Sequence, residues 1–287
     1  MTVTLKLGSL CSGYGGLDIA VENHFRKKYG EAETIWFAEN DKKCSQVFSK
    51  HWEGIPNHGD IKKIDWTLIE EPDVLSVGFP CQPYSQAGNR TGSRHEKNIW
   101  EYIASGISTL RPKWVVLENV QGILSLGGPG VIAETTSFGY DCRWQIVRTS
   151  DISGTHRRAR WFCLATLPNT SRERHGSREN DRRMGSSSCQ MEGEVQQQRS
   201  WEISEYRTSK DYGEYTEAVE RWERVTRPAP DELFDDEGAS SLWVEWMMGL
   251  PPGWVTGHGL TRSAELKMLG NGVNPQAAEF ALSLIDK

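Results

Sequence analysis

Residues 5–29 read LKLGSLCSGYGGLDIAVENHFRKKY and set the architecture of the chain. The first six residues, Leu5–Leu10, form a short apolar run that predicts a strand. The segment Ser9-Leu10-Cys11-Ser12-Gly13-Tyr14-Gly15-Gly16-Leu17 then leads from this strand into a helix. Its glycines let the backbone turn tightly and approach a ligand closely. The spacing is G-x-G-G, not the dinucleotide pattern G-x-G-x-x-G, and a purely structural turn explains the loop equally well.

Beyond this stretch, short apolar runs alternate with helical patterns. Further strands are predicted at Thr34–Ala38, Val74–Val77, Trp114–Leu117 and Trp161–Ala165. Helices are predicted at Leu17–Tyr29, Lys42–His51 and Ile99–Leu110, and later at Leu242–Met248 and Ala277–Ile285. Strands that alternate with helices build βαβ units. The sequence therefore predicts an α/β fold with a doubly wound, mostly parallel sheet, whose ligands bind beyond the carboxyl ends of the strands.

The composition changes between about Pro168 and Ser240, where apolar residues become sparse and Arg, Glu, Ser and Gln accumulate. A disordered linker would have this composition. Aromatic residues in the second half favour a small irregular domain instead; they are Trp201, Tyr206, Tyr212, Tyr215 and Trp222. We therefore predict a first domain over residues 1–167, an inserted domain over 168–240, and a segment over 241–287 that returns to the first domain.

The chain has 287 residues, a formal net charge of −6 and 37% hydrophobic residues, as in ordinary soluble globular proteins. No apolar run approaches the ~20 residues of a membrane helix, and the first residues lack a signal peptide, so we expect a cytoplasmic location. None of the six cysteines forms a C-x-x-C pair, so we expect neither a metal site nor a disulfide framework. The negative charge argues mildly against nucleic-acid binding, but arginines gather between Arg157 and Arg183.

Acidic residues follow the second predicted strand. Glu39 stands at the strand end, where an acid commonly accepts hydrogen bonds from ribose hydroxyls. Asp60, followed by Ile61, stands where an acid can accept from an adenine amino group. Helix capping is the alternative for the first of these segments, and Asp41 is the predicted cap. Together with the glycine loop, Glu39 favours an adenosine-type cofactor.

The segment Gly78-Phe79-Pro80-Cys81-Gln82-Pro83-Tyr84-Ser85 follows the next strand. The two prolines hold Cys81 in an extended backbone. A lone cysteine is usually a small buried hydrophobe, but the polar neighbours argue against burial here. A nucleophilic role requires surroundings that favour the thiolate. In Val116-Leu117-Glu118-Asn119-Val120, Glu118 is either a satisfied structural acid or a carboxyl that shares a proton with a ring nitrogen.

In their order and spacing, these motifs resemble the C5-cytosine-specific DNA methyltransferase family. The segment His156-Arg157-Arg158-Ala159-Arg160-Trp161-Phe162 is similar to the family's Arg-x-Arg strand. Trp243–Pro251 is similar to the element after the recognition domain, and Leu269-Gly270-Asn271-Gly272-Val273 to the last motif. The resemblance covers Leu5–Thr166 and about Ser240 to the end. Two departures are Cys11, where the family commonly has Phe, and Ser153-Gly154-Thr155-His156, which lacks the usual proline; we interpret His156 as an ordinary hydrogen-bonded histidine.

The resemblance implies a Rossmann-like class I methyltransferase fold with a small irregular target-recognition domain. It implies that Cys81 adds to carbon 6 of a flipped-out cytosine and that Glu118 holds ring nitrogen 3. Arg160 would contact the base oxygen, and Arg158 would support the nucleophile loop or Glu118. The implied cofactor is S-adenosyl-L-methionine, which becomes S-adenosyl-L-homocysteine. The residues assigned to it are Cys11, Gly13, Tyr14, Gly16, Glu39, Asn40, Asp60, Ile61, Pro80, Ile99 and Asn271.

The implied partner is double-stranded DNA, methylated within a short target sequence that residues 168–240 would recognise. Tyr84–Arg94 is the expected lid over the base. DNA contacts are assigned to Gln82, Ser85, Arg90, Arg94, Arg172 and Arg174, and a solvated charged surface is the alternative for any single arginine. We expect a monomer of the restriction–modification or phage type, acting separately from any cognate restriction endonuclease.

Three other functions compete with this one. An RNA cytosine methyltransferase of the transfer-RNA branch usually carries Cys-Phe-Thr near the recognition segment, whereas the cysteines here read Cys163-Leu164-Ala165 and Cys189-Gln190-Met191. A non-catalytic DNA-binding relative would be favoured by loss of Cys81 or Glu118, and both are present. A Rossmann-type oxidoreductase is disfavoured by the glycine spacing.

Overall fold

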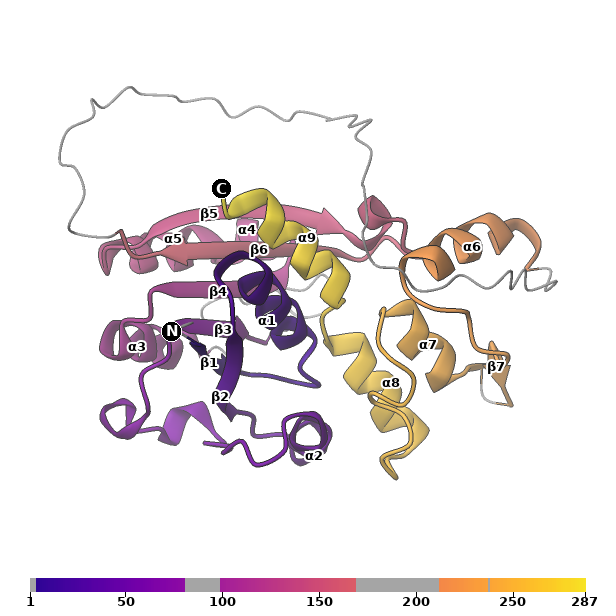
Figure 1. Ribbon diagram of the computed structural model, residues 1–287, viewed down its shortest axis with the longest axis horizontal. Coiled ribbons are helices and arrows are strands. Elements are labelled where there is room, and N and C mark those ends of the chain that lie inside the picture. The colour runs from indigo at the N-terminus through magenta and orange to yellow at the C-terminus, as the bar shows by residue number, and fades with distance from the viewer. Residues whose placement is uncertain (1–3, 81–98, 169–211, 237) are drawn as a thin grey trace, which may run out of the picture. The chain divides into compact units, whose positions relative to one another are not determined.

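The computed structural model describes residues 4–80, 99–168, 212–236 and 238–287. Within these ranges, six strands form one sheet in the order β2-β1-β3-β4-β6-β5 (Figure 1). The strands are β1 (Leu5–Leu10), β2 (Ala32–Ala38), β3 (Val74–Gly78), β4 (Trp114–Val120), β5 (Asp141–Arg148) and β6 (Ala159–Thr166). Every strand predicted from the sequence is present, with ends that differ by at most a few residues.

The pairing of the strands is mixed. β1 pairs in parallel with β2 and with β3, and β3 pairs in parallel with β4. β6 runs antiparallel to both of its neighbours, β4 and β5. The short connection 149–158 between β5 and β6 suits a hairpin, because a parallel crossover needs a longer connection. The α/β fold with a mostly parallel sheet is confirmed.

β5 was not predicted, and its position explains why. It is the edge strand of the sheet, and most of its residues are exposed to solvent, including Asp141, Arg143 and Arg148. An edge strand that is covered on little of its surface needs no continuous apolar run. Its apolar residues alternate with polar ones from Cys142 to Ile146, a half-buried pattern that differs from the continuous apolar runs by which the other strands were predicted.

Helices cover both faces of the sheet. In β4, Trp114 and Val116 pack with α1 (Gly16–Tyr29) and α9 (Pro275–Ile285), which lie side by side across one face. Val115 and Leu117, whose side chains alternate with these, pack with α3 (Trp100–Leu110) and α5 (Gly128–Ser137) on the other face. A strand buried on both faces is the physical basis of its continuous apolar sequence, and the doubly wound arrangement is confirmed.

Five further helices complete the described part of the chain. They are α2 (Lys42–His51), α4 (Ile123–Leu126), α6 (Thr216–Val225), α7 (Ser241–Met247) and α8 (Arg262–Asn271). As predicted, Asp41 caps α2, because its side chain accepts from the backbone N–H groups of Lys43 and Cys44. A third apolar cluster joins the glycine loop to α2 and α8 through Tyr14, Val47 and Leu269.

The chain divides into two compact units. Met1–Pro168 and Glu217–Lys287 belong to one of them. The stretch 169–216 is separate, and the structure describes only residues 212–216 of it, with a 3-10 turn at Gly213–Tyr215. Residues 217–240, which the predicted boundaries assign to the recognition domain, belong to the first unit. Across the described residues, no helix combines the length and the apolar character needed to span a membrane.

Candidate active site

The glycine loop between β1 and α1 has the backbone geometry that its sequence requires. Cys11, Gly13 and Gly15 all have positive φ angles, of 55°, 57° and 85°. The amide of Cys11 donates to the Ala38 carbonyl across the β1–β2 gap at 2.9 Å. At Gly16, a Cβ atom would lie 2.3 Å from the Val273 carbonyl oxygen. The loop therefore packs directly against the C-terminal part of the chain, and glycine at position 16 is needed for that approach.

Glu39 at the end of β2 faces this loop. One of its carboxylate oxygens accepts from the Gly13 amide at 2.9 Å, and the other accepts from the Asp41 amide at 2.8 Å. Burial raises the pKa of Glu39, and these backbone donors oppose the shift. Each carboxylate oxygen keeps a second lone pair, so Glu39 can still accept hydrogen bonds from ligand hydroxyls.

A cavity of about 780 Å³ lies at the carboxyl ends of β1, β2 and β3. The chain order of the sheet reverses at this point, because β2 lies on one side of β1 and β3 lies on the other. Such reversals are where ligands bind in open α/β sheets. Every residue that the sequence analysis assigns to the cofactor lines this cavity: Cys11, Gly13, Tyr14, Gly16, Glu39, Asn40, Asp60, Ile61, Pro80, Ile99 and Asn271.

Glu118 and Arg160 line the same cavity and form an ion pair. Arg160 Nε lies 3.1 Å from Glu118 Oε1. The two residues come from β4 and β6, whose antiparallel register places Glu118 opposite Phe162 and Arg160 opposite Val120. Glu118 is only 6% exposed. Burial raises the pKa of its carboxyl, while the guanidinium groups of Arg160 and Arg158 lower it, so this acid sits where its proton affinity can be tuned.

Arg158 has a different environment from Arg160. Its Nη2 atom donates to the carbonyl oxygens of Gly270 and Gly272, each at 2.7 Å. These carbonyls flank Asn271, which lines the cavity. Arg158 is not among the cavity-lining residues.

Several predicted site residues lie outside the described residues. They are Cys81, Gln82, Ser85, Arg90, Arg94, Arg172 and Arg174, together with all of the expected lid Tyr84–Arg94. Cys81 follows Pro80 directly in the sequence, and Pro80 lines the cavity. The roles assigned to these residues stay predictions.

The Nε2 atom of His156 donates a hydrogen bond to the Met247 carbonyl at 3.2 Å. Burial lowers its pKa, and it does not line the cavity. A 3-10 turn, Thr149–Ile152, precedes the segment 153–156. In this turn, Asp151 accepts a hydrogen bond from the Arg148 amide at 2.8 Å. Within the segment that lacks the family's usual proline, the Gly154 amide donates to the Thr149 carbonyl at 2.9 Å.

The sequence analysis missed other residues of the cavity wall. Asp18 is 2% exposed, lines the cavity, and accepts from the Ser76 hydroxyl. Burial raises its pKa to about 6. Lys267 and Met268 of α8 also line the cavity. An acid directly after a glycine loop was an available signal for Asp18, whereas nothing local marks Lys267 or Met268.

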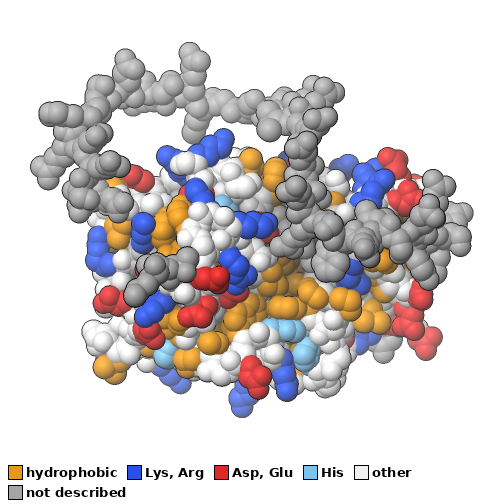
Figure 2. Space-filling view, in the orientation of Figure 1, with side chains coloured by type: hydrophobic (Ala, Val, Ile, Leu, Met, Phe, Trp, Pro, Cys, Tyr) orange, Lys and Arg blue, Asp and Glu red, His pale blue; other side chains and the backbone are white. Residues whose placement is uncertain are grey.

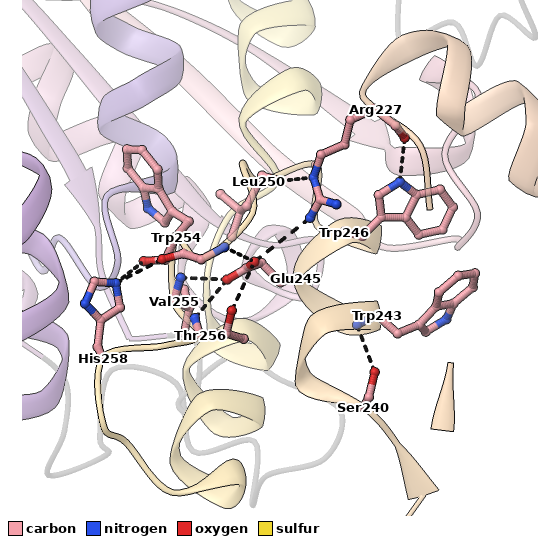
Figure 3. A network of polar contacts seen from close by, with 12 residues as sticks. Arg227, Ser240, Trp243, Glu245, Trp246, Leu250, Trp254, Val255, Thr256 and His258 are labelled. Carbon is pink, nitrogen blue, oxygen red and sulfur yellow. Dashed lines mark hydrogen bonds and ion pairs between the residues drawn. The ribbon is translucent and has the colours of Figure 1, made fainter. Parts of the chain in front are cut away.

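A buried carboxylate organises the connection between α7 and α8 (Figure 3). Glu245 is fully buried and accepts from the backbone amides of Gly253, Val255 and Thr256 at 2.7–2.9 Å. This network holds the loop that carries Trp254, whose indole N–H donates to the Tyr14 carbonyl at 2.9 Å. The loop thereby supports the glycine loop from outside the cavity.

The surface around these elements carries both signs of charge. On the face shown in Figure 2, Lys and Arg side chains lie among Asp and Glu side chains, and hydrophobic side chains cross the middle of the view. No group of three or more His, Cys, Asp or Glu residues in the described part of the chain can hold a metal ion.

Comparison with known proteins identifies relatives of this arrangement. The sequence profile described as C-5 cytosine-specific DNA methylase matches residues 5–234. Type II methyltransferase M.BsuFI of Bacillus subtilis is 31% identical over 171 residues, which cover 58% of this chain and 40% of that protein. Type II methyltransferase M.CviJI of a Paramecium bursaria Chlorella virus is 37% identical over 139 residues, covering 47% of this chain and 38% of the relative. The match thus spans about 40% of the length of these relatives.

Solved structures share the fold at low sequence identity. The crystal structure of a Spodoptera frugiperda DNMT2 mutant aligns with a TM-score of 0.66 at 14% identity, covering 99% of this chain and 100% of that one. The S. pombe Dnmt2 methyltransferase aligns with a TM-score of 0.63 at 17% identity, covering 98% of each chain.

Proposed function

The chain belongs to the C-5 cytosine-specific DNA methylase family, and from that premise we propose that it methylates carbon 5 of cytosine within a specific short sequence of duplex DNA. The observation that carries the proposal is the Glu118–Arg160 ion pair in the wall of the cavity that Glu39 and the glycine loop also line. A buried acid–guanidinium pair suits recognition of a pyrimidine edge. It lies beside a pocket with the features of an adenosine site.

The cavity fits S-adenosyl-L-methionine as the methyl donor. Its volume of about 780 Å³ falls in the range of small-molecule sites. Glu39 has lone pairs free to accept from ribose hydroxyls, and Asp60 and Ile61 stand where the adenine would lie. We assign the methionine part to the loop from Cys11 to Gly16, which lines the same cavity. When bound, this cofactor supplies an electrophilic methyl group and leaves as S-adenosyl-L-homocysteine.

The base side of the site would activate an otherwise unreactive ring. We assign Cys81 the role of nucleophile, whose thiolate adds to carbon 6 of the cytosine. Glu118 would hold ring nitrogen 3 and the exocyclic amine, and its raised pKa favours donation of a proton there. Arg160 would contact the base oxygen and stabilise negative charge as it develops. After carbon 5 gains the methyl group, loss of its proton releases Cys81 and restores the aromatic ring.

The DNA partner imposes a further requirement. Carbon 5 is inaccessible to this chemistry inside a duplex, so the target cytosine must be flipped out of the stack. We assign the lid role to Tyr84–Arg94, with Gln82, Ser85, Arg90 and Arg94 near the DNA, and sequence recognition to 168–240, with Arg172 and Arg174. The type II relatives favour a modification enzyme. We further propose that it acts in the cytoplasm as a monomer, separately from any cognate restriction endonuclease.

The test is methyl transfer from S-adenosylmethionine carrying a labelled methyl group. Mixed-sequence duplex DNA and transfer RNA serve as alternative substrates. The wild-type chain is compared with Cys81→Ser and with the matched control Cys142→Ser, which removes a thiol on β5 that does not line the cavity. We expect label on DNA cytosines with the wild type and the control, and none with Cys81→Ser. Sequencing of the product for 5-methylcytosine then gives the target site.

Three other results of this test would contradict the proposed reaction or its proposed nucleophile. Label on transfer RNA alone would identify an RNA cytosine methyltransferase. DNA binding without transfer to either substrate would identify a non-catalytic relative. Equal transfer by wild type and Cys81→Ser would exclude Cys81 as the nucleophile.

A further inference from the structure

Arg158 and Arg160 are separated by a single residue, yet their side chains serve different parts of the molecule. Arg160 reaches Glu118 inside the cavity. Arg158 reaches the turn after α8, where its Nη2 atom donates to the carbonyls of Gly270 and Gly272. A donor shared by two carbonyls on either side of one residue holds the backbone of that residue, Asn271, in place.

Tyr14 also holds the turn 270–273, through a hydrogen bond and through packing of its ring. Its hydroxyl donates to the Val273 carbonyl at 2.5 Å, and its ring is 1% exposed. A Cβ atom on Gly272 would lie 1.8 Å from the Tyr14 ring, so the turn and the ring are packed in direct contact. Tyr14 is held in turn by Trp254, whose indole donates to its carbonyl.

The Arg158 guanidinium lies at the C-terminus of α8, where a positively charged donor is favourable. The last carbonyls of a helix lack intrahelical partners, and the C-terminus of a helix carries partial negative charge. Gly270 belongs to the last turn of α8, and Gly272 is its C-terminal cap. Hydrogen bonds from a charged donor to such carbonyls are stronger than neutral ones. Arg158 therefore contributes strongly to the conformation of the turn that carries Asn271.

We propose that Arg158 is a positioning residue for the cofactor: with Tyr14 it clasps the turn 270–273 and so holds Asn271 and the end of α8 against the cofactor cavity. This inference rests on the proposed function, since it takes S-adenosylmethionine as the ligand of the cavity. It adds to the role of supporting the nucleophile loop or Glu118 that the resemblance assigns to Arg158.

The test measures cofactor binding without DNA, by calorimetry or equilibrium dialysis, beside steady-state kinetics with duplex DNA. In Arg158→Ala, loss of the two charge-assisted bonds should weaken the affinity for S-adenosylmethionine by about 10–100-fold. The KM for the cofactor should rise similarly, while kcat at saturating cofactor should fall by less than about 5-fold, because an interaction that only shapes the binding site acts on ground-state binding.

Two further variants separate positioning from loss of folding. Arg158→Lys should recover most of the affinity, because one nitrogen of Arg158 makes both bonds and a single ammonium group can do the same. Tyr14→Phe removes only a hydroxyl and should weaken binding in the same direction by a smaller factor. Arg157→Ala removes an exposed arginine next in the sequence and serves as the matched control, with affinity expected to stay unchanged.

The outcomes distinguish this inference from the proposed function. If wild type and Arg158→Ala bind the cofactor equally while kcat collapses, Arg158 acts on the reacting groups and the positioning role is wrong. If Arg158→Lys binds S-adenosylmethionine as weakly as Arg158→Ala, the hydrogen bonds to the Gly270 and Gly272 carbonyls do not account for the affinity, and the positioning role is wrong. If the wild type does not bind S-adenosylmethionine at all, the proposed function fails and takes this inference with it. Weakened binding in Arg158→Ala supports the inference even if no methyl transfer to DNA is detected.

Discussion

At the scale of single residues, two buried acids of the cavity wall, Glu118 and Asp18, have pKa values that burial shifts. Glu118 and Asp18 are both almost completely buried, and burial raises the pKa of each. Their partners differ in kind. Arg160 forms an ion pair with Glu118, whereas Asp18 accepts from the neutral hydroxyl of Ser76. Removing the charge of each acid should therefore have different consequences.

Glu118→Gln should abolish most of the turnover and leave cofactor binding intact. A glutamine amide cannot supply a proton to ring nitrogen 3, and general acid catalysis typically contributes about 10²–10⁴-fold. Single-turnover methylation of DNA measures the loss, and Glu134→Gln, a change on α5 outside the cavity lining, is the control. Activity within about 3-fold of the wild type would rule out this role for Glu118.

Asp18→Asn should change how stability depends on pH. The pKa of Asp18 is about 6 in the folded chain against 3.8 for the ordinary group, so the folded state binds the proton more tightly. Stability from this group is present below about pH 4 and is lost as pH rises towards 6. Asparagine carries no charge and can still accept from Ser76. Above pH 6 the variant should therefore be more stable than the wild type, by on the order of 2–3 kcal/mol at most.

Urea unfolding of the two proteins at pH 4, 5, 6 and 8 measures this difference. Groups that are the same in both chains cancel in the comparison. A difference in unfolding free energy that stays constant across this range would show that Asp18 does not titrate as described.

At the scale of elements, the α7–α8 connection combines a buried charge, Glu245, with apolar residues such as Leu250 and Val255. Glu245 accepts several backbone N–H groups of the loop after α7, and Arg227 Nη2 lies 3.9 Å from its carboxylate. Trp246, the next residue, donates its indole N–H to the Arg227 carbonyl. Without the carboxylate, the loop amides would be buried with no acceptor, which is costly.

Glu245→Ala should destabilise the protein by about 3–5 kcal/mol, the usual cost of leaving partners of a buried charge unpaired. Thermal unfolding measures this as a lowered Tm. Glu217→Ala is a matched control, because it also removes a glutamate paired with an arginine, but the Glu217 side chain is 82% exposed. The control should cost less than about 1 kcal/mol. Equal Tm values for the two variants would contradict the role given to Glu245.

At the scale of the whole molecule, the cavity is assembled from distant parts of one compact unit. Its wall includes Cys11 at the end of β1, Glu39 after β2, Glu118 in β4 and Asn271 at the end of α8. α9 continues from that last segment and covers a sheet face beside α1. The first and last parts of the described chain thus form one core and one pocket.

A fragment of residues 1–168 should therefore fail to fold by itself. Without α9, apolar side chains on one face of the sheet, such as Val116 and Phe162, lose the cover of Ala278 and Leu282. Co-expression with a fragment of residues 217–287 should restore a soluble complex. Circular dichroism and binding of a hydrophobic dye measure both states. A cooperative thermal transition for the first fragment alone would show that α9 is dispensable.

Local patterns in the sequence were sufficient to predict much of the fold, and the resemblance to a known family supplied most of the residues of the cavity wall. β1 and α2 have the predicted bounds, because an apolar run and a capping aspartate act on neighbouring residues. The residues assigned to the cofactor converge on one cavity, since parallel strands bring their carboxyl ends to one edge of the sheet. The bounds of β1 and α2 depend on interactions between neighbouring residues. The meeting of the strand ends follows from the parallel βαβ topology.

Only the tertiary structure decided the rest. The edge strand β5 lacks the continuous apolar run of the buried strands, and the antiparallel direction of β6 follows from its hairpin with β5 and not from its own residues. Arg158 and Arg160 look alike in sequence, yet one binds a carbonyl 112 residues away and the other a carboxylate on β4. These partners are distant in the sequence and become neighbours only when the sheet and helices pack together. Local sequence patterns therefore cannot distinguish the two arginines.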